Sequence, residues 1–138
     1  MEIEDRLPKT IKDQLKEKEL QFEIAILEAS RKFSPDNFEV LFHLGNAYTK
    51  IGEYVKGLEI DIKLTLLAPE NSVVHYNLAC SFSLLGRVDE SLSELEKSLS
   101  LGYAEFDFIR KDKDMEEARK DKRFEEILVR FEKQKSST

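Results

Sequence analysis

Apolar residues recur at helical spacing along most of the chain, and proline, asparagine and glycine interrupt them at regular intervals. The segments SPDN at 34–37 and APEN at 68–71 each place a proline and an asparagine just after an apolar run. Proline stops a helix because it lacks an N–H, and an asparagine side chain can cap the next helix. Gly52 and Gly86 lie within the apolar stretches, where a left-handed residue lets the chain reverse. The pattern predicts helical hairpins separated by these punctuation segments.

A period of 34 residues relates the hairpins to each other. Shifting the sequence by this period keeps size and polarity at many positions, pairing Leu44 with Leu78, Gly45 with Ala79, Tyr48 with Phe82, Gly52 with Gly86, Leu58 with Leu92 and Leu67 with Leu101. A glycine within a helix costs about 1 kcal/mol relative to alanine. The small residues on the apolar stripe therefore indicate close packing of neighbouring helices.

This 34-residue unit resembles the tetratricopeptide repeat, with its signature W-x2-L-G-x2-Y, then A-x3-F, then P. The first copy reads Leu41-x2-Leu44-Gly45-x2-Tyr48, Gly57-x3-Asp61, Pro69, and the second reads His75-x2-Leu78-Ala79-x2-Phe82, Ser91-x3-Leu95, Tyr103. The resemblance implies an all-α, right-handed superhelix of antiparallel helix pairs with a C-terminal capping helix. Asp61 departs from the pattern, because it replaces an aromatic residue. We expect a slight rotation of its helix, or a carboxylate that reaches solvent or a basic partner.

We predict a single domain over residues 1–138, with repeats at 38–71 and 72–105. A degenerate repeat or N-terminal helical pair occupies 5–37, a short helix and a capping helix occupy 106–134, and a frayed tail occupies 135–138. For residues 8–33 a helical pair and one long helix are both open, and the pair is preferred because the periodicity slips near Lys18. The tail is similar to those that close many bacterial proteins of this family. Its apolar stripe would cover the end of the stack: Phe124, Ile127, Leu128 and Phe131.

Composition narrows the class of protein. Hydrophobic residues make up 41% of the 138 residues and charged residues 36%, which predicts a soluble globular chain. No apolar run is long enough to span a bilayer, and MEIEDRLPKT lacks the features of a secretory signal, so we expect a cytoplasmic protein with no membrane partner. The net charge of −6 argues against nucleic acid as a binding partner, because a protein that binds the phosphate backbone needs a basic patch. The lone Cys80 fits a reducing compartment.

The resemblance also implies a function, because the first helices of such repeats line a concave groove that binds another protein or a peptide. The expected groove residues are Glu39, Phe42, His43, Asn46, Thr49, Lys50, Val73, Tyr76, Asn77, Cys80 and Ser83. Asn46 and Asn77 coincide with the asparagines that hold a heat-shock protein's C-terminal carboxylate in the chaperone-binding branch. Asparagines at these positions are also common family residues that tie helices together, and this second interpretation is preferred. Phe42, however, stands where that branch has a lysine. We therefore predict a non-enzymatic adaptor or scaffold, with co-chaperone activity as a distant alternative.

Other interpretations remain open. Phe42 and Tyr76 suit either an aromatic trough or packing between first helices. Self-assembly through exposed end helices is the main alternative function, so the chain is expected to be a monomer or a weak homo-oligomer. His43, His75 and Cys80 share no catalytic or metal-binding spacing, and Asp112 and Asp114 lack an EF-hand context. We expect no enzyme activity, no cofactor and no metal.

Overall fold

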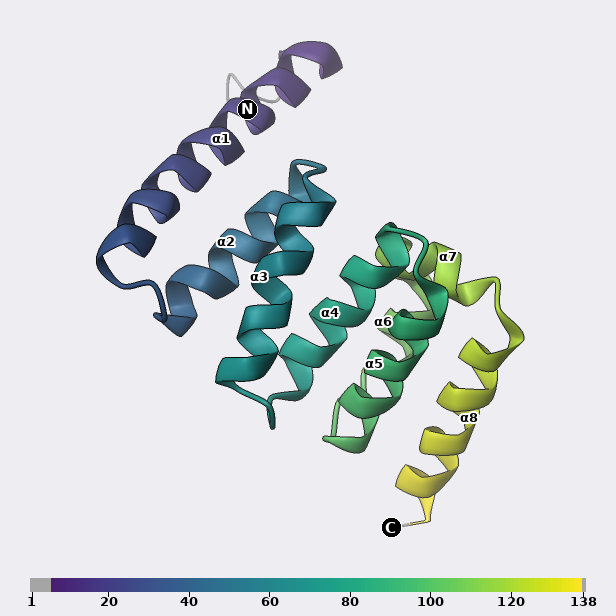
Figure 1. The fold of residues 1–138 in the computed structure, drawn as a ribbon. Helices are drawn as coiled ribbons and strands as arrows, with labels where there is room; N and C mark the ends of the chain where they lie inside the picture. Colours follow the sequence, from purple (N-terminus) through teal and green to yellow (C-terminus); the bar gives the residue numbers. More distant parts are fainter. Residues whose placement is uncertain (1–5, 138) are drawn as a thin grey trace.

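The computed structural model describes residues 6–137, and every regular element in that range is a helix (Figure 1). In chain order the elements are α1 (Lys9–Phe33), α2 (Phe38–Lys50), α3 (Tyr54–Leu67), α4 (Ser72–Leu84), α5 (Val88–Ser100), α6 (Phe106–Lys111), the short 3-10 turn η2 (Lys113–Met115), α7 (Glu116–Arg119) and α8 (Lys122–Ser136). None of the described helices is both long and apolar enough to cross a membrane.

The predicted helix caps and hairpin turns are both confirmed. The side chain of Asn37 accepts a hydrogen bond from the Val40 amide at the start of α2, and Asn71 accepts from the Val73 and Val74 amides at the start of α4. The hairpin turns use Gly52 and Gly86, with φ of 88° and 74°. In this left-handed region an added Cβ is strained, so glycine is the suitable residue at both turns.

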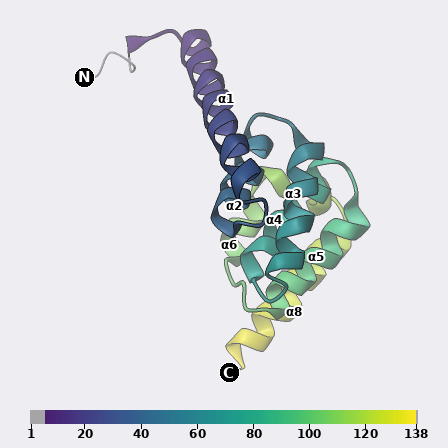
Figure 2. The same ribbon diagram turned by 60° about the vertical axis from the view of Figure 1, so that its left-hand side comes forward.

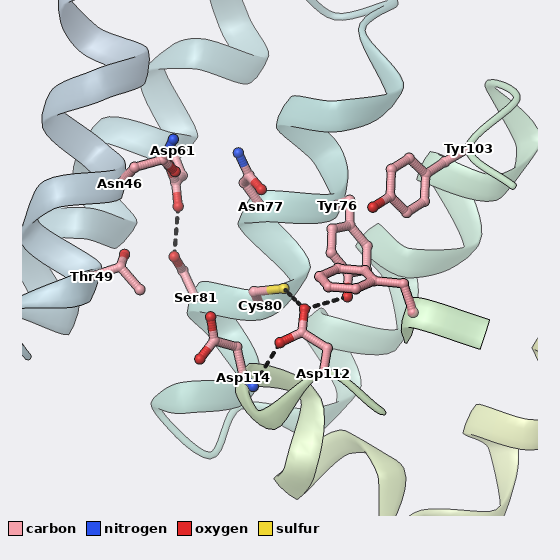
Figure 3. Close-up of a pocket in the computed structure, with 11 residues that line it drawn as sticks. Asn46, Thr49, Asp61, Tyr76, Asn77, Cys80, Ser81, Tyr103, Asp112 and Asp114 are labelled. Carbon is pink, nitrogen blue, oxygen red and sulfur yellow. Dashed lines mark hydrogen bonds between the residues drawn. The ribbon is translucent and has the colours of Figure 1, made fainter. Parts of the chain in front are cut away.

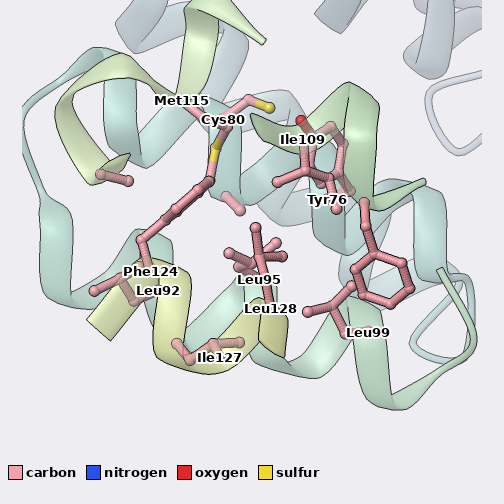
Figure 4. Packing of buried hydrophobic residues seen from close by; sticks show 13 residues of the cluster. Tyr76, Cys80, Leu92, Leu95, Leu99, Ile109, Met115, Phe124, Ile127 and Leu128 are labelled. Carbon is pink, nitrogen blue, oxygen red and sulfur yellow. The ribbon is translucent and has the colours of Figure 1, made fainter. Parts of the chain in front are cut away.

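The hairpins share their apolar sides in two main clusters. Leu41, Leu44 and Tyr48 of α2 pack with Ile60 and Leu64 of α3, and Val74 of α4 joins them from the next hairpin. The larger cluster connects the second hairpin to the C-terminal helices (Figure 4); its largest members are Tyr76, Leu92, Leu95, Leu99, Phe106, Ile109, Met115, Phe124, Ile127 and Leu128. Each hairpin therefore depends on its neighbour to cover its apolar face, as in repeat proteins.

The preference for a helical pair at residues 8–33 was wrong. Residues Lys9–Phe33 form one continuous helix of 25 residues. The segment KEKELQ at 16–21 contains no glycine or proline, and Glu, Lys, Leu and Gln are good helix formers, so nothing there breaks the helix. None of its residues is buried, and its N-terminal half extends away from the other helices (Figure 2).

The C-terminal segment closes the stack as expected, with one difference. A short helix, a turn anchored by the fully buried Met115, and the terminal helix α8 follow each other, and Phe124 and Leu128 of α8 are buried. However, α8 continues to Ser136, so fraying from residue 135 is not observed. Residue 138 of the predicted tail lies outside the described residues.

Candidate protein-binding groove

A cavity of about 220 Å³ opens between the first helices of the two hairpins and the C-terminal segment (Figure 3). We call it the groove cavity. It is lined by Asn46 and Thr49 from α2, Asp61 from α3, Tyr76, Asn77, Cys80 and Ser81 from α4, and Tyr103, Phe108, Asp112 and Asp114 from the segment after α5. No lysine, arginine or histidine is among the lining residues, whereas three of them are carboxylates.

The structure brings together five of the residues predicted for the groove, namely Asn46, Thr49, Tyr76, Asn77 and Cys80. Glu39, Phe42, His43, Lys50 and Val73 do not line the cavity. Phe42 stacks on Phe38 with ring centroids 5.8 Å apart, and Nε2 of His43 lies 3.8 Å from a Glu39 carboxylate oxygen at the surface. Ser83 was placed wrongly: it is fully buried, and its hydroxyl accepts a hydrogen bond from the Ala118 amide of α7. The C-terminal segment covers the position that would otherwise face the groove.

The amides of Asn46 and Asn77 are available to a ligand. Both residues are half-buried in the cavity wall, and neither side chain is hydrogen-bonded to another part of the described chain. An asparagine amide offers two donors and an acceptor, which matches the alternating groups of a peptide backbone. The interpretation that these asparagines only tie helices together therefore finds no contact to support it among residues 6–137.

Asp61 is the most unusual residue of the cavity. Its carboxylate is 4% exposed, and its Oδ2 accepts a hydrogen bond of 2.6 Å from the Ser81 hydroxyl. The expectation that this carboxylate reaches solvent was wrong, and no ion pair joins it to a basic residue in the described chain. Burial raises the pKa of Asp61 from 3.8 to about 7, while the hydrogen bond from Ser81 opposes that rise.

Gly45 makes room for this carboxylate. A Cβ atom built on Gly45 would lie 3.0 Å from Asp61 Oδ1 and 3.2 Å from Ile60 Cγ2. Both contacts are tight, so a side chain at position 45 would displace Asp61. The combination of a glycine in α2 with an acid at the family's aromatic position in α3 is the sequence signal for a buried polar site here.

An aromatic and acidic wall forms the other side of the cavity. The Tyr76 hydroxyl donates to Asp112 Oδ2 at 2.6 Å, and Asp112 Oδ1 accepts from the Asp114 amide at 3.0 Å. The ring of Tyr76 stacks on the ring of Tyr103, with the two centroids 4.6 Å apart, and the centroid of the Phe108 ring lies 6.2 Å from that of Tyr76. Six lining residues were not predicted from the sequence as groove residues: Asp61, Ser81, Tyr103, Phe108, Asp112 and Asp114. These contacts depend on how the tail folds back, which no local motif encodes.

Tyr76 takes one of the two roles that the sequence left open, packing between helices. It is 3% exposed and belongs to the large core cluster, yet its hydroxyl reaches the cavity wall. Burial raises the pKa of its phenol, and the hydrogen bond to Asp112 acts in the same direction. Tyr76 is therefore a packed residue that positions Asp112, rather than an open surface for an apolar ligand.

The thiol of Cys80 is held in its neutral form. Burial raises its pKa well above the ordinary value, with a further contribution from the negative charge of Asp112, whose Oδ2 lies 3.8 Å from Sγ. His75 does not contact it: Nδ1 lies 2.6 Å from Glu94 Oε2, and Nε2 donates to the Pro69 carbonyl at 2.8 Å. A nucleophilic cysteine needs a base that lowers its pKa, and this environment does the opposite. Within residues 6–137 no group of three or more His, Cys, Asp or Glu side chains could hold a metal ion.

Comparisons with known proteins show the fold. No protein-family model matches the chain. A chloroplastic protein of Arabidopsis thaliana is 40% identical over 91 residues, which is 64% of this chain and 27% of that protein, so the match spans about a quarter of the relative. Two solved structures of MamA, a tetratricopeptide repeat protein, superpose closely. "MamA RS-1 ArsTM double mutant" has a TM-score of 0.64 at 17% identity and covers 87% of this chain and 70% of its own. "MamA MSR-1 C2" has a TM-score of 0.65 at 22% identity, and the match covers 88% of this chain and 72% of that one.

The predicted fold class is thereby confirmed. The chain has the all-α, right-handed tetratricopeptide-type stack of antiparallel helix pairs.

Proposed function

We propose that this chain is an adaptor or scaffold that binds a segment of a partner protein in the groove of the stack, and that the groove cavity receives a basic side chain of that segment. The observation that supports it most is the composition of the cavity. Two amides without an intramolecular partner in the described chain, Asn46 and Asn77, lie beside three carboxylates, and no basic residue lines the site.

Electrostatics favours a cation as the guest. Asp61 is removed from water and has no positive partner in the described chain, so its charged form is disfavoured at neutral pH. A lysine or arginine side chain entering the cavity would compensate that cost and would meet Asp112 and Asp114 as well. The aromatic wall of Tyr103 and Phe108 adds faces to which a cation is attracted.

The same charges argue against the co-chaperone alternative. A peptide ending in Glu-Glu-Val-Asp would bring its carboxylates against Asp61, Asp112 and Asp114, although Asn46 and Asn77 are present to hold a carboxylate. We therefore expect such a peptide to bind at least a hundredfold more weakly than a basic peptide of equal length.

The test is fluorescence anisotropy with amidated dodecapeptide libraries that differ at one central position. Lysine and arginine libraries should bind more tightly than the norleucine and glutamate libraries. Asp61→Asn and Asn77→Ala should each weaken the lysine library about tenfold, whereas the matched control Glu59→Gln, an exposed acid on α3, should not. Equal binding of the lysine and norleucine libraries would contradict the cation site, and binding unaffected by both cavity variants would contradict the groove.

A second candidate function is self-assembly, and the exposed apolar side chains of α1 favour it. Neither candidate requires nucleic acid or a membrane as partner. The single cysteine of the sequence can form no internal disulfide, which fits a reducing compartment, and we propose the cytoplasm; the name of the plant relative places that protein in the chloroplast. Fractionation of native cells with an antibody to the chain would test the compartment.

A further inference from the structure

Helix α1 carries a continuous apolar stripe on its solvent side. The stripe consists of Ile11 (41% exposed), Leu15 (38%), Phe22 (69%), Ile26 (51%) and Phe33 (90%). At 100° per residue these five positions fall within an arc of about 60°. Their spacing alternates between four and seven residues, an 11-residue repeat that keeps a stripe nearly straight along an α-helix.

The stripe is separate from the side of α1 that holds the helix on the stack. Ile24 and Leu27 pack against the cluster formed by α2, α3 and α4, and they lie on the opposite side of the helix. Packing within the chain therefore already has its own apolar face. The outer stripe has no contact within residues 6–137 that buries it, since none of the residues of α1 is buried.

The size of the stripe suits an interface between two copies. With roughly 200 Å² for a fully exposed aromatic side chain and somewhat less for an aliphatic one, the five side chains expose on the order of 550 Å². Two copies would bury about 1,100 Å² of apolar surface before the flanking polar side chains are included. Stable specific interfaces bury about 1,200–2,000 Å² in total, and the stripe reaches that range once the flanking polar side chains are counted with it.

The order of residues is also self-complementary. In an antiparallel pair related by a two-fold axis at the level of Ile24, Leu15 faces Phe33 of the other copy and Phe22 faces Ile26 of the other copy. Apolar residues thus meet apolar residues at each of these positions, as an isologous interface requires. The opposite end of the stack does not offer such a surface, because α8 exposes charged residues such as Glu126, Arg130 and Lys133. A closed dimer is therefore favoured over a head-to-tail filament.

We propose that α1 is a homodimerisation helix, and that a second copy of this chain packs antiparallel on the stripe through Leu15, Phe22, Ile26 and Phe33, with Ile11 at its margin. The proposal deepens the self-assembly candidate and is independent of the groove, which lies on other helices. No residue of α1 lines the groove cavity, so the proposed interface uses none of the cavity residues.

Sedimentation velocity between 1 and 200 μM tests the proposal. The wild-type chain should be a dimer over most of this range. Phe22→Glu/Ile26→Glu should weaken dimerisation at least a hundredfold. The double variant should keep the helical circular dichroism spectrum and a two-state melting transition, because both side chains are exposed in the monomer. Leu66→Glu, at a 77% exposed apolar residue on α3, is the matched control and should remain dimeric.

The orientation has its own test in a Cys80→Ser background. Chains carrying Leu15→Cys should form a disulfide with chains carrying Phe33→Cys, and Leu15→Cys chains alone should not crosslink. A wild-type monomer at 200 μM, a dimer that survives the double glutamate variant, or oligomers that keep growing with concentration would each overturn the proposal. Monomers that bind anionic lipid vesicles through Phe22 and Ile26 would overturn it in favour of a membrane surface. Peptide binding should be unchanged in the double variant, so failure here is distinguishable from failure of the groove.

Discussion

Replacing Asp61 by asparagine should stabilise the protein at alkaline pH and leave its stability unchanged at acid pH. Asparagine is nearly the same size and can still accept the hydrogen bond from Ser81, so the charge is the main difference. Burial raises the pKa of Asp61 from 3.8 to about 7, a difference that corresponds to roughly 4 kcal/mol.

The pH window follows from the direction of this shift. The folded chain holds the Asp61 proton more tightly than the unfolded chain, so the free energy of unfolding falls as the pH rises from about 4 to about 7 and is level above that. Well below pH 4 the wild type carries a neutral group at position 61 in both the folded and the unfolded state, as the variant does at every pH. Above pH 7 the wild type must bury a charge, and we expect the variant to be more stable by about 2–4 kcal/mol.

Urea unfolding at pH 4.5, 6 and 8 measures the effect, followed by circular dichroism. The quantity to compare is the difference between variant and wild type, because other carboxylates titrate equally in both. Glu59→Gln, on the exposed side of the same helix, serves as the control and should show a difference that does not change with pH. A difference for Asp61→Asn that is also constant from pH 4.5 to 8 would refute the claim that this carboxylate is desolvated without a positive partner.

Three further outcomes follow from local geometry. Gly86→Ala should cost about 1–2 kcal/mol, because φ at this turn is 74°, and a melting curve that matches wild type would contradict this. Phe124→Ala should cost about 3–5 kcal/mol in urea unfolding because the side chain is 1% exposed, whereas Phe33→Ala, at 90% exposure, should change the monomer by less than about 0.5 kcal/mol. Cys80 should react with a disulfide reagent far more slowly in the native protein than in urea, since burial raises its pKa; equal rates would show an accessible thiolate.

The repeat could be predicted from sequence because its signals are local. Asn71 caps the helix that immediately follows it, and Gly86 adopts a left-handed conformation that few other residues tolerate. Each signal needs only a few neighbouring residues to act. A period of 34 residues that repeats such signals therefore predicts both the hairpins and their stacking.

The N-terminal helix shows where this reasoning fails. A slip in periodicity near Lys18 was interpreted as a break, but periodicity describes which side of a helix is covered, not whether the helix continues. With no glycine or proline at that point, the backbone stays helical. The one helix carries two apolar faces, the inner side at Ile24 and Leu27 and the outer stripe, and their overlap is what disturbs the period.

The cavity could be predicted only in part, for a related reason. Asn46 and Asn77 are at family groove positions within the repeats, and both line the cavity. Asp112 reaches Tyr76 across 36 residues of sequence, in a tail that does not repeat the family pattern. The burial of Asp61 likewise depends on space left by Gly45 in another helix. Contacts of this kind follow from packing between elements, which the spacing of residues within one element does not describe.

The most direct test of the proposed function is a nuclear magnetic resonance titration of the 15N-labelled chain with a lysine-centred peptide selected from the library. We predict that the largest shifts fall on the side-chain amides of Asn46 and Asn77 and on the backbone amides of Asp61 and Asp112, and that a norleucine-centred peptide does not reproduce them. Shifts confined to the outer faces of α3, α5 and α8, or no shifts with millimolar peptide, would contradict a groove that grips a basic segment.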